Sequence, residues 1–394
     1  MKSGWEARPL GDVCEIRSGG TPSKAKPEFW GGSIPWISPK DMKSRVVSDS
    51  IDHITATAVE GGAARVVPLG SVLVVVRSGI LARTIPVART ASTLAVNQDI
   101  KALIPYATVQ PKYLQYFLES VEPSLLKSVT RGATVHRLET PVLQGLPIPV
   151  PPLAEQERIV SILDEALAEI DQATQDCSLN LWRAAWLFDS VLAQLLHESE
   201  IGDLAALGSV CVTSAGGTPP KSDKQNYAGG TVPWILSGEV NQPEITGATN
   251  FISDRGLANS SAKVFPPETV LVAMYGATAG KVSILRIAAS TNQAVCGILP
   301  NDQYIPEFLV WYLRSKSHEI IAQAQGNAQP NLSQAKIRQT LIPILPIEDQ
   351  QAIVASVESV LAAVSDYRRR AERKLELLCE LRASLLNHAI TGQL

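Results

Sequence analysis

Two long stretches of the chain have apolar residues that recur in steps of three and four. The first runs from about Leu153 to His197 and the second from about Ile347 to Ala389. Such steps place the apolar residues on one face of a helix, and no Gly or Pro interrupts the first stretch. The pattern predicts two long helices, the first a rod of roughly 65 Å. Because one helix cannot bury such a stripe alone, each helix needs a partner.

A proline-rich segment precedes each predicted helix. Successive prolines predict that Leu146–Pro152 is extended, since the residue before a proline avoids the helical region. The first helix then opens at Pro151-Pro152-Leu153-Ala154-Glu155-Gln156, and the second opens at Leu345-Pro346-Ile347-Glu348-Asp349-Gln350. The chain therefore repeats one joint, between an extended segment and a long helix, about half its length apart.

The stretches before the helices have a mixed pattern. Trp5–Ser18 alternates in the manner of a strand and stops at the turn signal Gly19–Pro22. The β-branched run Val66–Val76 indicates a buried strand. Pro111–Leu118 begins with proline and continues with helical apolar spacing. Together these elements favour an α+β (mixed α/β) fold.

The second half of the chain repeats the first. The offset between matching segments drifts from about 198 to about 194 residues, as expected when loops vary and core elements do not. The matching pairs are Leu10–Cys14 with Leu207–Cys211, Gly19–Pro22 with Gly216–Pro219, Gly31–Ile37 with Gly229–Ile235, Asn97-Gln98 with Asn292-Gln293, and Pro111–Leu118 with Pro306–Leu313. A period of this length is too long for a solenoid repeat, so the chain is a duplicated domain–helix module.

This duplication predicts four parts: two similar globular domains at 1–152 and 201–345, and two helical parts at 153–200 and 346–394. The simplest way to bury two equal apolar stripes is to pair the helices antiparallel as a coiled coil. Antiparallel pairing would also relate the halves by pseudo-two-fold symmetry and hold the two domains at opposite ends.

The charge is distributed unevenly along the chain. The net charge of −3 at first argues against a nucleic-acid partner. Residues 1–152, however, carry 17 Lys and Arg against 12 Asp and Glu, whereas residues 153–200 carry 2 against 10. Residues 201–345 carry 10 against 9, and residues 346–394 carry 6 against 7. The excess of base therefore belongs to the first globular domain, and the excess of acid belongs to the first long helix.

Several classes of protein are disfavoured by the sequence. The first residues show no signal peptide, and no window approaches the roughly 18 uninterrupted apolar residues of a membrane span, so we expect a cytoplasmic protein. Five cysteines lie far apart without a CxxC pair, which argues against a disulfide framework and against a zinc site.

Motifs for catalysis are also missing or weak. The Asn-Pro-Pro-Tyr and Asp-Pro-Pro-Tyr motifs of amino-methyltransferases are absent. Gly276–Ser283 resembles a phosphate loop, but its glycines are one residue too close and Lys281 is not followed by Ser or Thr. Glu372-Arg373-Lys374 contains a Glu-x-Lys found in nucleases, but it lies within a predicted helix and is better explained as a solvated charge run. The histidines have no metal-ligand spacing. We therefore expect a non-enzymatic chain.

The order of these motifs resembles a known family. Gly-Gly-Thr-Pro, Gly-Gly-x-x-Pro-Trp-Ile, Asn-Gln, and a proline-led segment ending in Gln that opens a long helix occur in this order twice. The pattern covers essentially the whole chain and resembles the specificity subunit of type I restriction–modification systems.

The resemblance implies a division of labour between the parts. The globular domains would be target-recognition domains, each reading one half of a bipartite sequence in double-stranded DNA. The coiled coil would set the spacer between the half-sites and carry two modification methyltransferase subunits, with restriction subunits in the assembled complex. The chain itself would hold no cofactor, and S-adenosylmethionine, ATP and Mg would belong to the partner subunits. The assembled complex would be an adenine-specific DNA methyltransferase and an ATP-dependent endonuclease.

Physical reasoning agrees with this arrangement. Half-sites on one face of a duplex lie roughly 34 Å or a multiple apart, a distance that a helical rod can span. The acidic first helix cannot lie against phosphates. We expect that helix to face a protein partner, with an ordinary solvated surface as the alternative.

Candidate DNA contacts are the Arg, Lys, Asn and Gln side chains near turns, because these types pair with phosphates and base edges. In the first domain they are Lys24, Lys26, Lys40, Lys43, Arg45, Arg77, Arg83, Arg131, His136 and Arg137. In the second domain they are Lys221, Lys224, Tyr275, Lys281, Asn327, Gln329 and Asn331. Each could instead be an ordinary exposed residue. The repeated Asn-Gln pairs are better explained as caps or turns, and Trp36 and Trp234 as core residues.

Two other functions stay open from the sequence. One is a stand-alone methyltransferase or nuclease of the same lineage, against which the missing motifs argue. The other is a purely structural coiled-coil adaptor, against which the duplicated recognition domain argues. The resemblance also weakens in one loop, because the first domain has Val135-His136-Arg137 where the second has Gln329-Pro330-Asn331.

Overall fold

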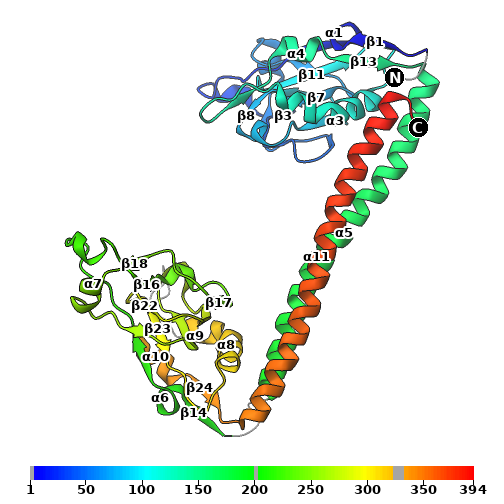
Figure 1. Cartoon of the computed structure of the whole chain (residues 1–394). Helices are drawn as coiled ribbons and strands as arrows, with labels where there is room; N and C mark the ends of the chain where they lie inside the picture. The colour runs from blue at the N-terminus through cyan, green and yellow to red at the C-terminus, as the bar shows by residue number, and fades with distance from the viewer. Residues whose placement is uncertain (1–3, 199–202, 323–331) are drawn as a thin grey trace. The chain divides into compact units, whose positions relative to one another are not determined.

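The computed structural model describes residues 4–198, 203–322 and 332–394. The chain divides into two compact units (Figure 1). Unit 1 consists of Met1–Cys177 with Glu372–Leu394, and unit 2 of Ser178–Ala371. Each unit contains a globular part built of sheets and short helices, together with one portion of each long helix.

The globular part of unit 1 contains four sheets, one of which is the two-stranded pair of β8 Arg77–Ser78 and β12 His136–Arg137. The five-stranded sheet has the order β2-β11-β7-β9-β4, the four-stranded sheet β5-β3-β10-β6, and the other two-stranded sheet β1-β13. The strands are β1 Glu6–Pro9, β2 Cys14–Ser18, β3 Trp30–Ile37, β4 Val46–Val47, β5 His53–Ile54, β6 Val66–Val67, β7 Val72–Val75, β9 Val87–Thr90, β10 Leu94–Val96, β11 Ile100–Pro105 and β13 Pro147–Val150. The helices are α1 Leu10–Val13, α2 Ala56–Glu60, α3 Pro111–Lys127 and α4 Thr140–Gln144, with 3-10 turns η1 Pro27–Phe29 and η2 Gly79–Ala82.

Among the described residues, unit 2 repeats three of these four sheets. Its orders are β15-β23-β20-β21-β17, β18-β16-β22-β19 and β14-β24. Corresponding pairs run in the same sense, since β3 with β10 and β16 with β22 are both parallel. The strands are β14 Leu204–Ala206, β15 Thr213–Ala215, β16 Val232–Ile235, β17 Glu244–Ile245, β18 Phe251–Ile252, β19 Val264–Phe265, β20 Thr269–Ala273, β21 Val282–Leu285, β22 Ala289–Thr291, β23 Val295–Ile298 and β24 Leu341–Pro343. The helices and 3-10 turns are α6 Leu207–Val210, η3 Lys224–Asn226, η4 Ser237–Glu239, α7 Asp254–Ala258, η5 Gly276–Thr278, α8 Pro306–Ser315, α9 Ser317–Ala322 and α10 Gln334–Gln339.

Both long helices are confirmed, as α5 Leu153–Glu198 and α11 Ile347–Thr391. In unit 1, Leu163 near the start of α5 shares a core with Ala389 at the end of α11. In unit 2, Leu192 near the end of α5 shares a core with Val357 near the start of α11. The start of each helix therefore packs against the end of the other, which confirms the antiparallel pairing.

Two single strands predicted from the sequence are each divided in the structure. Trp5–Ser18 forms β1, a turn of helix α1, and then β2 in a different sheet. Val66–Val76 forms β6 and β7, which also belong to different sheets. Pro68 and Gly70 account for the second break, since proline removes a ladder donor and Gly70 adopts a φ of +83°. The apolar run Val66–Val76 is thus continuous in the sequence but passes from one sheet to another in the structure.

The two Gly-Gly-Thr-Pro turns pack against the Asn-Gln turns. A Cβ on Gly19 would lie 2.1 Å from the Asn97 carbonyl oxygen, and one on Gly216 would lie 2.3 Å from that of Asn292. The indole of Trp36 donates to the Gly20 carbonyl at 2.9 Å. Trp234 donates likewise to Gly217 at 3.1 Å. The close approach explains why glycine stands at these turns, and the tryptophans are buried core residues, as expected.

Candidate nucleic-acid interface

A two-stranded ribbon in unit 1 brings together three of the predicted DNA contacts. β8 Arg77–Ser78 pairs antiparallel with β12 His136–Arg137, so that Arg77 lies directly opposite Arg137 and Ser78 opposite His136. Both arginine side chains are mostly exposed, at 56% and 65%. Side chains of a strand alternate between its faces. The two arginines therefore share one face of the ribbon.

The acidic neighbours of these arginines are few. The Arg77 Nε lies 3.8 Å from an Asp99 oxygen, too far for a hydrogen bond, and the Arg137 Nε lies 3.3 Å from Glu139. Burial lowers the pKa of Lys101, and the nearby charge of Arg137 lowers it further. Arg83 and Arg131 are exposed as well. This edge of the first domain is therefore positively charged.

The lysines that follow the Gly-Gly-Thr-Pro turn and Trp36 are all exposed. Lys26 lies over the Phe29 ring, 5.0 Å from its centroid. Lys40 donates to Asp52 at 2.7 Å, and this hydrogen bond raises its pKa. Neither the Lys24 nor the Lys43 side chain has such a partner among the described residues. Exposed lysines are of the residue type that contacts phosphates.

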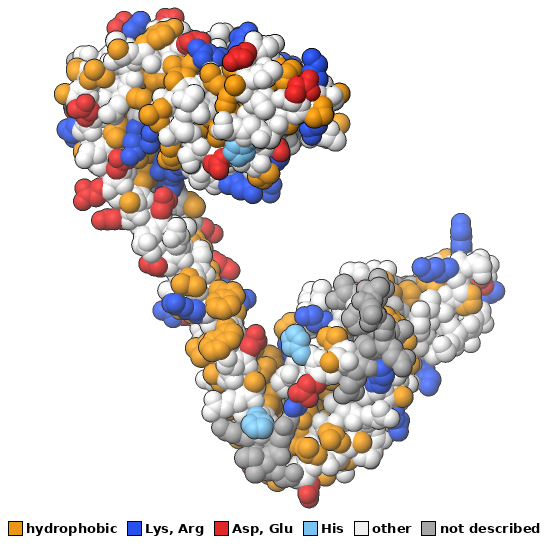
Figure 2. Space-filling model, turned by 180° about the vertical axis from the view of Figure 1, so that it is seen from behind, with side chains coloured by type: hydrophobic (Ala, Val, Ile, Leu, Met, Phe, Trp, Pro, Cys, Tyr) orange, Lys and Arg blue, Asp and Glu red, His pale blue; other side chains and the backbone are white. Residues whose placement is uncertain are grey.

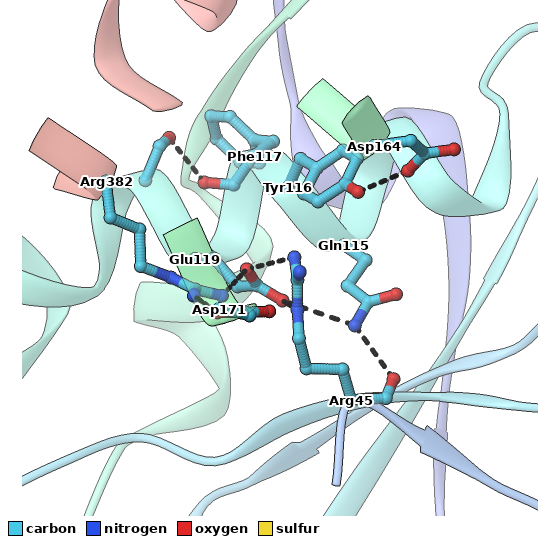
Figure 3. A network of polar contacts seen from close by, with 9 residues as sticks. Arg45, Gln115, Tyr116, Phe117, Glu119, Asp164, Asp171 and Arg382 are labelled. Atoms are coloured by element: carbon cyan, nitrogen blue, oxygen red, sulfur yellow. Dashed lines mark hydrogen bonds and ion pairs between the residues drawn. The ribbon is translucent and has the colours of Figure 1, made fainter. Parts of the chain in front are cut away.

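Arg45 has a different environment, at the joint between the globular part and the helices (Figure 3). Its guanidinium donates to both carboxylate oxygens of Glu119, at 2.9 and 2.6 Å, and lies 4.9 Å from the Tyr116 ring centroid. Burial opposes the charged form, but Glu119 outweighs it and raises the pKa of Arg45. The guanidinium is therefore occupied by an ion pair within the protein.

The same network extends to both long helices. Arg382 of α11 pairs with Asp171 of α5 and lies 4.0 Å from Glu119. Tyr116 donates to Asp164 of α5, which also accepts from Lys112 at 2.5 Å. These ion pairs tie α3 to both helices, a role that the sequence did not indicate.

In unit 2 the described members of the predicted set fall in two connections, one between β15 and β16 and one between β20 and β21. Lys221 is exposed, and Lys224 opens η3. Tyr275 is 38% exposed and precedes η5. Lys281 is exposed at the rim of a cavity of about 630 Å³, which Arg314 and residues of α5 and α9 also line. Asn327, Gln329 and Asn331 lie outside the described residues.

A buried glutamine anchors the start of each long helix. The Gln156 amide donates to the carbonyls of Thr108 and Pro151 and accepts from the Gln110 N–H. Gln350 makes the equivalent bonds to Gln303, Leu345 and Ile305. The sequence showed both glutamines in the repeated motif without showing their role. Each fixes a helix to the segment that leads into α3 or α8.

The exposed surface of α5 changes along its length. In unit 1 it carries the exposed acids Glu157, Glu165, Glu169 and Asp176, and Figure 2 shows acidic side chains on the helices next to the globular part of unit 1. In unit 2 the helix α5 carries an exposed apolar surface. This surface consists of Leu179, Trp182, Trp186 and Leu187, which are 45%, 67%, 61% and 53% exposed.

Neither metal chemistry nor a membrane helix is found in the described ranges. No group of three or more His, Cys, Asp or Glu there could hold a metal ion. Across the same residues, no helix is long and apolar enough to cross a bilayer. The Gly276–Ser283 segment contains the turn η5 and the first two residues of β21.

Comparison with known families gives matches over both halves of the chain. A family model described as the type I restriction modification DNA specificity domain matches residues 2–176 and again residues 198–376. The specificity subunit of the type I restriction enzyme EcoR124I/EcoR124II of Escherichia coli is 41% identical over 162 residues, which are 41% of this chain and 40% of that protein. The MjaIX specificity subunit of Methanocaldococcus jannaschii is 23% identical over 415 residues, covering 99% of this chain and 93% of that one.

Solved structures show the same fold. A chain from a study of complex assembly and conformational transition of the type I R-M system superposes with a TM-score of 0.77 at 19% identity, covering 100% of this chain and 99% of that chain. The HsdS subunit from Thermoanaerobacter tengcongensis superposes with a TM-score of 0.64, also at 19% identity, over 100% and 98% of the two chains.

Proposed function

The chain belongs to the type I restriction modification DNA specificity family, and from this premise we propose that its two domains read the two halves of a split target in double-stranded DNA. The observation that carries the proposal is the duplication. In the part of the chain that the structure describes, unit 2 repeats three of the four sheets of unit 1 with the same strand order and directions, while the residues at the loops differ. Two similar but non-identical readers suit an asymmetric, bipartite sequence.

The positively charged residues support DNA as the ligand. Neutralisation of phosphates by Lys and Arg supplies much of the affinity of a DNA-binding protein. In the first domain, the exposed lysines Lys24, Lys26, Lys40 and Lys43 and the β8–β12 edge provide such charges. Lys221, Lys224 and Lys281 do so in the second. Arg45 is left out of the proposed contact surface, because Glu119 holds its guanidinium.

The paired helices support the role of a spacer. α5 and α11 contain 46 and 45 residues and pair antiparallel in each unit. A rod of this kind, fixed to each domain by a buried glutamine, would set the gap between the half-sites and relate the domains by a pseudo-two-fold axis.

Protein partners would bind the helices. Exposed apolar surface of the kind formed by Leu179, Trp182, Trp186 and Leu187 marks a protein–protein contact. We assign it to a modification methyltransferase subunit, two copies of which would assemble on the chain, joined by restriction subunits. S-adenosylmethionine, ATP and Mg would bind in those partners, so that this cytoplasmic chain supplies specificity and the partners supply catalysis.

The test is to co-express the chain with the methyltransferase subunit encoded beside it and to map methylated bases across the host genome. The proposal predicts one split motif with a fixed gap. A contiguous motif would contradict it. Methylation by the purified chain alone, with DNA and S-adenosylmethionine, would instead favour a stand-alone methyltransferase.

A further inference from the structure

We propose that Arg77 and Arg137 act as a cross-strand pair that reads guanine in the first half-site, from within the major groove. This inference rests on the proposed function and adds to it the chemical identity of the bases and the side chains that select them. It concerns the β8–β12 ribbon of unit 1 alone.

The register of the ribbon sets the geometry of the pair. Arg77 and Arg137 are Cα partners in the antiparallel ladder. Directly opposed residues have Cβ atoms roughly 4.5–5.5 Å apart and point to the same face. The neighbouring bridge between Thr130 and Arg137 holds β12 from its other side, with hydrogen bonds of 2.8 and 3.0 Å. The backbone beneath the two guanidinium groups is therefore fixed on both sides.

The positive charges of Arg77 and Arg137 favour a hydrogen-bond acceptor from outside the chain. Like charges that face each other across two strands destabilise the ladder. Asp99 and Glu139 each approach one nitrogen atom of one arginine, whereas a guanidinium carries five donor N–H groups. Lys101 adds a further positive charge close to Arg137. Most donors of the pair therefore point to solvent, where a surface rich in acceptors would satisfy them.

Guanine in the major groove provides that acceptor surface. A two-stranded ribbon fits the groove, and the fork of Arg matches the O6 and N7 atoms of guanine. Stacked base pairs lie roughly 3.4 Å apart, so two side chains at the cross-strand spacing reach neighbouring base pairs. The ribbon is thus suited to two G·C pairs that are adjacent or one position apart.

The corresponding position in unit 2 carries a different side chain. Val76 donates to the Asp99 carbonyl at 2.8 Å, and Met274 donates to the Ala294 carbonyl at 2.8 Å in the same place. Tyr275 therefore stands where unit 1 has Arg77. A tyrosine hydroxyl lacks the two-donor fork of arginine. The guanine preference is accordingly expected in one half-site only.

The experiment compares methylation maps of the wild-type complex with those of R77Q, R137Q, R77K and R137K, all co-expressed with the methyltransferase subunit. R65Q is the control, because Arg65 is an exposed arginine of the same domain outside the ribbon. Each glutamine variant should lose preference for guanine at one position of one half-site, by about 10-fold or more. The lysine variants should keep only part of it, since an ammonium can donate to O6 and N7 of guanine but has no planar fork. Continued methylation at the relaxed motif shows that the variants fold and assemble.

Three results would overturn the assignment. One is a wild-type split motif in which neither half-site contains two G·C pairs that are adjacent or one position apart. Another is an unchanged motif in R77Q and R137Q with weaker methylation throughout, which would mark the pair as phosphate contacts. The third is loss of methylation in the glutamine variants with the full motif retained in the lysine variants. A failure of the proposed function is recognised separately, because the wild-type complex would then give no split motif.

Discussion

Gln156 and Gln350 make the same three hydrogen bonds at the starts of the two long helices. Both side chains are fully buried. Each accepts from a backbone N–H just before α3 or α8, at 2.8 and 2.9 Å, and donates to two carbonyls at 2.8–2.9 Å. Buried amides have no water to replace a lost partner. One buried side chain therefore attaches the start of each long helix to the segment that leads into α3 or α8.

The first prediction is that Q350L destabilises the chain. The leucine removes the hydrogen-bond partner of the Ile305 N–H and of the Gln303 and Leu345 carbonyls, at a cost of about 1–3 kcal/mol. Urea unfolding monitored by circular dichroism measures it. Q351L is the matched control, because Gln351 follows in the same helical turn and is exposed. Equal stability of the two variants would remove the anchoring role.

The second prediction concerns the ion pair of Arg45 with Glu119. A double-mutant cycle with R45Q and E119Q should give a coupling energy of about 1 kcal/mol, modest because Arg45 is partly exposed. R45Q should leave the methylated motif unchanged while it lowers the free energy of unfolding. R83Q is the comparison for the free energy of unfolding, because Arg83 is an exposed arginine. A coupling energy of zero, together with a changed methylated motif in R45Q, would indicate that Arg45 contacts DNA.

The third prediction is that G216A destabilises unit 2. The added Cβ would lie 2.1 Å from the Thr291 Oγ1 and 2.3 Å from the Asn292 carbonyl oxygen, so that backbone must move. Overpacking of this kind costs about 1–3 kcal/mol or more. G247A is the control, because a Cβ on Gly247 meets nothing within 4 Å. Thermal unfolding measures the melting temperature of both variants. A melting temperature of G216A equal to that of G247A would contradict the prediction.

The fourth prediction is that W182A and W186A weaken assembly with the methyltransferase subunit by about 10-fold or more, as expected for exposed aromatic anchors. L69A serves as the control, because Leu69 is 63% exposed on the globular part of unit 1. Sedimentation of mixtures over a range of concentrations measures the dissociation constant. Unchanged assembly in both tryptophan variants would show that the partner binds elsewhere.

The long helices and the duplication could be predicted from the sequence because their signals are periodic. An apolar stripe of more than forty residues admits one local structure, and a motif order that occurs twice implies one topology used twice. The prediction placed the starts at about Leu153 and Ile347, where the structure has them. A helix start marked by prolines leaves little freedom.

The divided strands and the network around Arg45 could not be predicted in this way. Whether Val66–Val76 is one strand or two depends on which sheets accept its halves, a tertiary choice that local pattern does not contain. Arg45 meets Glu119 across 74 residues, so its residue type alone could not separate an internal ion pair from a DNA contact. The opposition of Arg77 and Arg137 likewise emerged from the ladder register.

The most direct test of the account is to lengthen the helices and map the methylated motif. One heptad would be inserted between Cys177 and Ser178 of α5 and one between Ala371 and Glu372 of α11, at the boundaries of the two units. Seven residues keep the apolar stripes in register. The account predicts the same two half-sites separated by a longer gap. Altered half-site bases with an unchanged gap would contradict it.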